Sequence, residues 1–162
     1  MSETKVVIQP IPPELRPWAT ALITEHWCSH MIMSRLAWFD TRELPAYVAF
    51  HDEQPAGLAT YIIKHDECEL VTLNSLIEGK GIGTALLNAV ADVSRGAKCK
   101  RMFLTTANDN LRALQFYQKR DMRIVAVHKG AIDAAREAKQ NIPLLGYHDI
   151  PMRDELELEL QL

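Results

Sequence analysis

The chain has 162 residues, of which 48% are apolar, and a formal net charge of −3 with neutral histidines. This size suits one domain, expected over residues 1–162, which needs no disulfide to stabilise its core. The slightly acidic balance disfavours a dedicated nucleic-acid binder, and no apolar run is long enough for a transmembrane helix. The N-terminus lacks a signal-peptide layout and Cys28, Cys68 and Cys99 are far apart, so we expect a cytoplasmic protein with reduced thiols.

The first half of the chain predicts one helix and several short strands. Apolar runs bounded by prolines or turn-forming polar residues mark the strands, and apolar residues near one helical face mark the helix. The expected elements are a strand at 6–9, a helix at 13–27 and strands at 47–51, 57–64 and 68–74. Two short turns in succession join the last three strands, which indicates an antiparallel meander. Residues 29–45 have no clear period, and 31–33 suit either a strand fragment or a helix end.

The second half of the chain alternates helices with strands. The expected elements are helices at 84–95, 111–120 and 131–140 and strands at 101–106, 122–128 and 155–160. In the last strand, leucines alternate with Glu155, Glu157 and Glu159, a pattern typical of a half-buried strand with one face in water. Helices between strands indicate some parallel pairing. The sequence therefore predicts a single mixed α/β domain, with a partly antiparallel twisted sheet flanked by helices.

Three alternating glycines, Gly79, Gly81 and Gly83, occupy a junction between a strand and a helix. Glycines let the backbone approach a ligand closely, and the start of a helix offers unpaired N–H groups and a partial positive charge. This combination predicts an anion site, above all for a phosphate or pyrophosphate. Walker spacing is absent, and Thr84 stands where a dinucleotide fingerprint needs its third glycine. The alternative is a tight turn that binds no ligand.

Together with a later segment, this turn resembles the GNAT superfamily of acyl-coenzyme A-dependent N-acyltransferases. Gly81 and Gly83 match the family pattern Gln/Arg-x-x-Gly-x-Gly/Ala, which follows a strand and opens a helix. The second family element, roughly Asn-x-x-Ala-x-x-Phe-Tyr-x-Lys, is matched by Asn110, Ala113, Phe116, Tyr117 and Lys119. The two elements occur in the family's order with a strand between them. The resemblance covers residues 68–128 by motif and most of the chain by the order of its elements.

The resemblance implies acetyl-coenzyme A (acetyl-CoA) as co-substrate and assigns residues to it. In this family the turn binds the pyrophosphate, a role carried here by Gly79, Lys80, Gly81, Ile82, Gly83 and Thr84. The pantetheine arm is implied to insert between a splayed strand at 71–75 and its parallel neighbour at 102–106. A backbone N–H near Leu73 would polarise the thioester carbonyl. Asn110 and Ala113 are implied to contact the arm, and Tyr117 is implied to protonate the leaving thiolate.

Tyr117 and Glu69 are the catalytic candidates. An unperturbed phenol has a pKa of about 10, so it is protonated at neutral pH and can supply a proton to a thiolate. The alternative for Tyr117 is a core aromatic on an amphipathic helix. The attacking amine must first lose a proton, for which a carboxylate on a strand is a suitable base. We favour Glu69 over Glu67, which shares its strand parity; the alternative is that both are exposed charges at a strand end.

Two positions depart from the family pattern. Glu78 stands where Gln or Arg is usual. A carboxylate about 6 Å from a pyrophosphate costs roughly 2–3 kcal/mol per charge at an effective dielectric near 20, unless it points away or cations compensate it. Asp121 replaces the usual glycine after the second motif helix. In a left-handed cap, aspartate costs roughly 1 kcal/mol more than glycine.

The implied acceptor is a small-molecule or peptide amine, with no nucleic-acid or membrane partner; direct transfer needs no metal, and a homodimer is a family-level expectation. Segment 129–153 predicts an acceptor wall through Tyr147, His148 and Arg153, or else a proline-braced connection. The acidic face at residues 155, 157 and 159 would attract a cationic acceptor or simply be solvated. Candidates for the 3′-phosphate of coenzyme A are Lys98, Lys100, Arg101 and Arg112. The alternative functions are a non-catalytic coenzyme A-binding module and an acyltransferase with another acyl donor.

Overall fold

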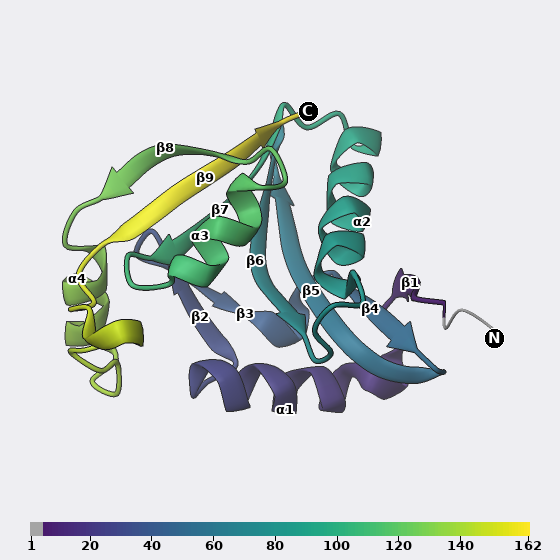
Figure 1. The fold of residues 1–162 in the computed structure, drawn as a ribbon, viewed down its shortest axis with the longest axis horizontal. Helices are drawn as coiled ribbons and strands as arrows, with labels where there is room; N and C mark the ends of the chain where they lie inside the picture. The colour runs from purple at the N-terminus through teal and green to yellow at the C-terminus, as the bar shows by residue number, and fades with distance from the viewer. Residues whose placement is uncertain (1–4) are drawn as a thin grey trace.

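A computed structural model describes residues 5–162 and contains a seven-stranded mixed sheet in the order β1-β4-β5-β6-β7-β9-β8 (Figure 1). Its strands are β1 (Val7–Pro10), β4 (Ala46–His51), β5 (Gln54–Lys64), β6 (Glu67–Ser75), β7 (Arg101–Ala107), β8 (Arg123–His128) and β9 (Glu155–Gln161). The helices are α1 (Arg16–Trp27), α2 (Ile82–Gly96), α3 (Leu111–Gln118) and α4 (Ala131–Ala138). The predicted mixed α/β fold is confirmed. Each expected element is present, with ends that differ by a few residues.

The segment 29–45, which has no clear sequence period, contains a separate β-hairpin. Its strands β2 (Met31–Ser34) and β3 (Ala37–Asp40) pair antiparallel, and a turn of 3-10 helix, Thr41–Glu43, follows them. The two turn residues, Arg35 and Leu36, adopt positive φ angles of 47° and 63° without a glycine. Two-residue hairpin turns usually rely on asparagine or glycine for such angles, so the usual local signal for this hairpin is missing.

Two hydrophobic clusters cover opposite faces of the sheet. The larger one joins α2 and Tyr117 of α3 to apolar side chains of the sheet. The other joins Leu22 and Ile23 of α1 to Ile32 of β2 and Leu58 of β5. Figure 1 accordingly has α2 and α3 on one side, with α1 and the β2–β3 hairpin on the other. No helix within residues 5–162 is long and apolar enough to cross a membrane.

The first turn of α2 lies directly against β5, where Gly57 permits the approach. A Cβ atom at Gly57 would lie 2.6 Å from the side chain of Ile82 and 2.9 Å from the carbonyl oxygen of Asn74. Real Cβ atoms do not come so close to backbone, so a larger residue would push the helix away from the sheet. The absence of a side chain at this position therefore fixes where the glycine turn sits relative to β6.

The parallel strands β6 and β7 separate part-way along their length. Their ladder consists of Glu67 opposite Arg101, Cys68 opposite Met102 and Glu69 opposite Phe103. Beyond this point β7 pairs with β9 up to Ala107, whereas β6 stays with β5 up to Ser75. The β5–β6 register shifts at Thr60 and Tyr61, which face Thr72 and Leu70 and leave Val71 as a bulge. A bulge bends its strand, so the opening after residue 69 has a local cause.

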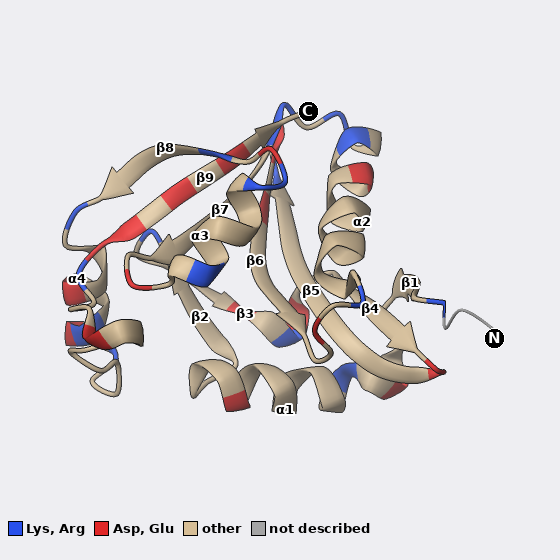
Figure 2. Cartoon of the chain, in the orientation of Figure 1, with Lys and Arg blue, Asp and Glu red and all other residues tan. Residues whose placement is uncertain are grey.

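The C-terminal strand β9 buries the face that the sequence predicts to lie in water. Glu155 and Glu157 are only 4% and 5% exposed, so this face of β9 is not in water. The strand lies between β7 and the edge strand β8, and its acidic residues alternate along it (Figure 2). The expectation of a solvated acidic face is wrong, because basic side chains from β7 and from the hairpin turn cover these carboxylates.

Candidate active site

The glycine turn forms one wall of a cleft of about 430 Å³, here named the glycine-loop cleft. Its other walls come from β6 and α3. The lining residues are Leu73, Ser75, Ile77, Glu78, Gly79, Gly81, Ile82, Gly83, Thr84, Asn110, Arg112, Ala113, Phe116, Tyr117 and Arg120. Of the residues expected at the pyrophosphate, the thioester carbonyl and the pantetheine arm, all but Lys80 line this cleft.

The backbone of the glycine turn is open toward this cleft. Gly79 and Gly81 have φ angles of 71° and 72°, in the left-handed region that favours glycine. Gly81 is the N-cap residue of α2, so the first N–H groups of the helix follow it directly. Within residues 5–162, no atom lies within 4 Å of where a Cβ of either glycine would be, so these positions need glycine for its backbone conformation rather than for lack of space. The arrangement suits an anion at the start of a long helix.

Two arginines complete the positive end of the cleft. Arg112 forms an ion pair with Glu78, which neutralises the carboxylate that departs from the family pattern. Arg120 donates to the hydroxyl of Thr84 at 2.7 Å and to the carbonyl oxygen of Phe116 at 2.8 Å. Its guanidinium carbon lies 3.7 Å from the centre of the Phe116 ring. The repulsion expected from Glu78 is therefore offset by a cation on α3.

Helix α3 begins at a side-chain cap. The Oδ1 atom of Asn110 accepts a hydrogen bond of 3.2 Å from the backbone N–H of Ala113. This contact stabilises the helix start and leaves the side-chain NH₂ of Asn110 as a donor at the cleft. After the helix, Asp121 takes the expected left-handed conformation with φ of 65°. The second motif is thus a short capped helix whose side chains face the glycine turn.

Tyr117 lies on α3 with only 9% of the residue exposed, inside the larger hydrophobic cluster and at the wall of the cleft. Its ring meets that of Phe116 edge-on, with centroids 5.2 Å apart. Burial raises the pKa of the Tyr117 phenol well above its ordinary value. The phenol is therefore fully protonated at neutral pH. It is both a core aromatic and a cleft residue, so the two interpretations from the sequence are compatible.

A second cleft, of about 710 Å³, lies where β5 and β6 meet the β2–β3 hairpin, and is here named the carboxylate cleft. Its lining residues are Ser34, Arg35, Ala37, Phe39, Ile62, Lys64, His65, Asp66, Glu67, Glu69, Phe103 and His128. Strand β6 borders both clefts, with Leu73 at the glycine-loop cleft and Glu69 at the carboxylate cleft. The two clefts thus adjoin the β6–β7 opening, which begins just after Glu69.

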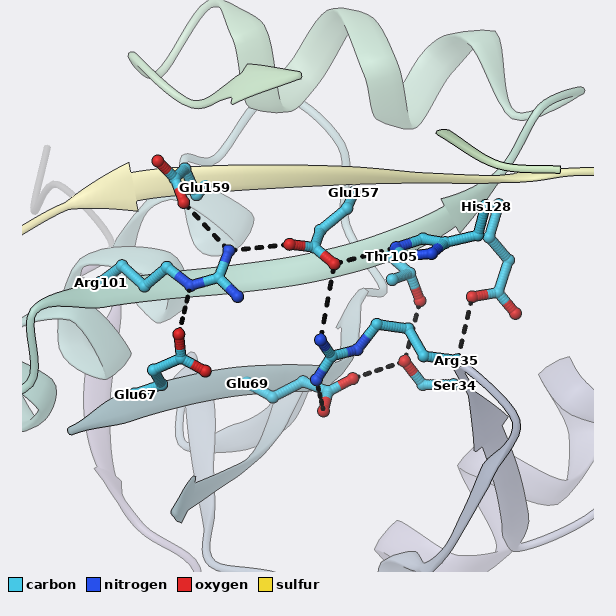
Figure 3. Close-up of polar contacts among 10 residues, drawn as sticks. Ser34, Arg35, Glu67, Glu69, Arg101, Thr105, His128, Glu157 and Glu159 are labelled. Atoms are coloured by element: carbon cyan, nitrogen blue, oxygen red, sulfur yellow. Dashed lines mark hydrogen bonds and ion pairs between the residues drawn. The ribbon is translucent and has the colours of Figure 1, made fainter. Parts of the chain in front are cut away.

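Glu69 is the most deeply buried carboxylate that lines the carboxylate cleft, with 6% of the residue exposed. The hydroxyl of Ser34 donates to its Oε1 at 2.5 Å, and Arg35 lies 4.0 Å from its Oε2 (Figure 3). Burial raises the pKa of Glu69, while the Ser34 hydrogen bond and the Arg35 charge oppose that rise. A carboxyl whose pKa is shifted toward neutrality suits proton transfer at physiological pH.

A network of charges lies beside Glu69 (Figure 3). Arg101 donates to Glu67 at 2.8 Å, to Glu157 at 2.7 Å and to Glu159 at 3.0 Å. The Nε2 atom of His128 lies 2.9 Å from Glu157. Burial by itself raises the pKa of Glu157, but the hydrogen bonds from Arg101 and His128 outweigh it, so the pKa is lowered. Glu157 is therefore ionised throughout the neutral range.

Comparison with known proteins identifies the family. The model of the Acetyltransferase (GNAT) family matches residues 12–122. The chain belongs to the GNAT acetyltransferase family. The uncharacterized protein YxbD of Bacillus subtilis (strain 168) is 42% identical over 144 residues, which cover 88% of this chain and 91% of YxbD. As a GNAT member, the chain is an acyltransferase.

Solved GNAT structures share the fold over nearly the whole chain. The IAA acetyltransferase from Bacillus cereus ATCC 14579 superposes with a TM-score of 0.75 at 22% identity, covering 98% of this chain and 100% of that one. A GNAT family acetyltransferase from Elizabethkingia anophelis with acetyl-CoA bound superposes with a TM-score of 0.71 at 18% identity, covering 99% and 100%. At these identities the likeness concerns the arrangement of the elements.

Several expected site residues of this GNAT protein lie elsewhere. Arg101 and Lys100 pair with carboxylates at the opposite end of β6 from the glycine turn, so neither lines the glycine-loop cleft. The loop that carries Tyr147 is held against the start of α3, because the backbone N–H of Tyr147 donates a hydrogen bond of 2.8 Å to the carboxylate of Asp109. None of the wall candidates Tyr147, His148 and Arg153 lines either of the two clefts.

The residues that sequence reasoning missed come mainly from the hairpin. Ser34, Arg35 and Phe39 line the carboxylate cleft, although their segment has no clear sequence period. Lys64, at the end of β5, joins them there through the strand order of the sheet. The available signal is the apolar run at 31–33, which is too short to distinguish a strand from a helix end.

Proposed function

We propose that this GNAT protein transfers an acetyl group from acetyl-CoA directly to a primary amine. The observation that carries the proposal is the pair of clefts at the β6–β7 opening, with an anion-binding turn and Tyr117 in one and a buried carboxylate in the other. Donor and acceptor would approach from separate sides and meet between the strands. Such an arrangement favours a ternary complex over a covalent acyl-enzyme.

The glycine-loop cleft suits acetyl-CoA, which supplies an acetyl group activated as a thioester. Backbone N–H groups from Gly81 to Thr84 would bind the pyrophosphate, with Arg120 adding positive charge and Arg112 offsetting the charge of Glu78. In the part of the chain that the structure describes, β6 pairs with β5 alone from Leu70 to Ser75, so its other edge is available to the pantetheine arm and the thioester carbonyl near Leu73. The side-chain NH₂ of Asn110 would donate to the same arm.

Glu69 would act as the base. It accepts one proton from the ammonium group of the acceptor, directly or through water, which leaves a nitrogen lone pair. That nitrogen then bonds to the acetyl carbon while the bond from this carbon to sulfur breaks. Tyr117 gives its phenolic proton to the departing thiolate and regains one from solvent, and the remaining extra proton leaves the nitrogen. Glu69 then returns its proton to solvent, so the products are an amide, a thiol and one net proton released.

The test compares Tyr117→Phe with Tyr47→Phe in an assay of thiol release from acetyl-CoA with a panel of amines. Tyr47 stacks on Tyr61 with ring centroids 5.7 Å apart and lines neither cleft, so its variant is the matched control. We expect Tyr117→Phe to lower kcat by about a hundredfold or more while coenzyme A affinity stays unchanged. If coenzyme A binds but no amine raises turnover, the chain is a coenzyme A-binding module and the proposal fails.

A further inference from the structure

The charges that face the carboxylate cleft are unequally neutralised. Asp66 pairs with Lys100 at 2.9 Å, and Glu67 pairs with Arg101 at 2.8 Å. Among the described residues, Glu69 has Arg35 as its one ionic partner, at 4.0 Å, and Arg35 is shared with Glu157 at 3.6 Å. Among the cations that line the cleft, Lys64 forms no ion pair within residues 5–162. The cleft therefore offers a bound acceptor one weakly paired carboxylate and one unpaired ammonium group.

The strand register places these two groups on one face. Ile62 of β5 lies opposite Glu69 of β6, and Lys64 lies opposite Glu67. Lys64 and Glu69 are therefore diagonal neighbours across an antiparallel pair, with about 7–8 Å between them at the backbone. The Nζ atom of Lys64 lies 5.1 Å from the centre of the Phe39 ring, so the ammonium group is held at the cleft.

From this geometry we infer that the acceptor is a free α-amino acid with an apolar side chain, an inference that rests on the proposed function. Its ammonium group would lie at Glu69 and its carboxylate at Lys64. In an α-amino acid the nitrogen and the nearest carboxylate oxygen are about 3 Å apart, and charge-assisted hydrogen bonds are about 2.8 Å long. A molecule of this length can bridge an ammonium group and a carboxylate whose side chains extend from diagonal neighbours on one face of the sheet.

The positions of Glu69 and Lys64 relative to the β6–β7 opening, and the apolar residues that line the carboxylate cleft, also fit an apolar α-amino acid. Glu69 is the last β6 residue paired with β7, so a nitrogen beside it faces the opening where the thioester would lie. Lys64 is near the closed end of the ladder, away from that opening. Ala37, Phe39 and Ile62 provide apolar contacts for the side chain of the acceptor.

The experiment measures kcat/KM for L-phenylalanine, L-phenylalaninamide and 2-phenylethylamine with the unaltered protein, Lys64→Gln and Lys129→Gln. The three acceptors share an apolar ring and an amine, but only the first has a carboxylate. The readout for each acceptor is the ratio of the variant to the unaltered protein, so that differences in amine basicity cancel. Lys129 is exposed in the turn after β8 and lines neither cleft.

We expect Lys64→Gln to lower kcat/KM for L-phenylalanine by about tenfold or more, mainly through KM, and to leave the amide and the amine within about twofold. Lys129→Gln should leave all three unchanged. If Lys64→Gln lowers kcat/KM equally for the three acceptors, the amino-acid inference fails while the acetyltransferase proposal stands. The same holds if the unaltered protein acetylates the amide or the amine but not L-phenylalanine. If none of the three is acetylated and other amines are, the inference also fails.

Discussion

The hydroxyl of Ser34 donates a hydrogen bond of 2.5 Å to Oε1 of Glu69. The same Ser34 oxygen lies 2.9 Å from Oγ1 of Thr105 on β7. The end of β2 is thus tied to both β6 and β7 near the point where these two strands separate. A carboxylate held in this way has one oxygen fixed within the protein and the other left toward Arg35 and the cleft.

Replacing Ser34 by alanine removes a hydrogen bond that stabilises the ionised form of Glu69. Since that bond opposes the rise in pKa caused by burial, the pKa of Glu69 rises further in Ser34→Ala. A base must be ionised to act, so we expect the acid limb of the kcat/KM profile to move to higher pH, with activity largely retained above it. The measurement is kcat/KM across the range from acid to mildly alkaline pH, and moving the limb by about one pH unit corresponds to about 1.4 kcal/mol.

Ser29→Ala is the matched control for this profile. Ser29 accepts a hydrogen bond of 3.0 Å from the backbone N–H of Met31 at the entrance to the hairpin, outside both clefts. If it moves the acid limb as far as Ser34→Ala does, the change reflects loosening of the hairpin rather than the missing contact to Glu69.

Removing the charge of Glu69 tests its role as base. Glu69→Gln keeps the shape of the side chain but accepts no proton, so we expect kcat/KM to fall by about 10²- to 10⁴-fold. Glu67→Gln is the matched control, because Glu67 lies on the same face of β6 but is paired with Arg101. Activity assays at saturating acetyl-CoA measure both variants. Equal losses in the two would assign the effect to the charge of the cleft as a whole.

Alanine substitutions at the two ends of α2 should differ in their effect on coenzyme A binding. Gly81 has a φ of 72°, so alanine there costs roughly 1 kcal/mol or shifts the backbone that faces the cleft. We expect Gly81→Ala to weaken coenzyme A binding severalfold, as measured by calorimetry. Gly96 ends the same helix without a positive φ and with no atom near its Cβ position, so Gly96→Ala should bind coenzyme A normally. Normal binding by Gly81→Ala would argue against the turn as the pyrophosphate site.

Ionisation of Glu157 makes the free energy of unfolding depend on pH in the acid range. Its pKa in the folded protein is lowered, so its stabilisation is complete above the ordinary carboxylate pKa and is lost as the pH falls through the folded value. We expect Glu157→Gln to lower the free energy of unfolding by roughly 1.5–3 kcal/mol at neutral pH and by less in acid. Urea unfolding at several pH values measures this. Asp92→Asn, which removes an exposed partner of Arg95, should change stability by less than about 1 kcal/mol at any of them.

The sequence alone determined the features that depend on neighbouring residues. The glycine turn, the amphipathic α2 and the capped α3 each follow from local backbone chemistry, and they lie together because the strand between them returns the chain to the same face of the sheet. Most residues expected around acetyl-CoA could therefore be named from two short motifs. The alternation in the last strand likewise predicted β9 with nearly correct ends.

Only the tertiary structure decided the acceptor side. Alternation along β9 gives two faces, and the glutamate face is buried because Arg35 and Arg101 from other elements cover it. The hairpin that carries Ser34 and Arg35 has no glycine in its turn, so its positive φ angles are disfavoured locally. Contacts with distant residues are present there instead: Ser34 binds Glu69, and Arg35 pairs with Glu157. The charge balance of this cleft depends on pairs formed between distant strands, which a pattern of neighbouring residues does not contain.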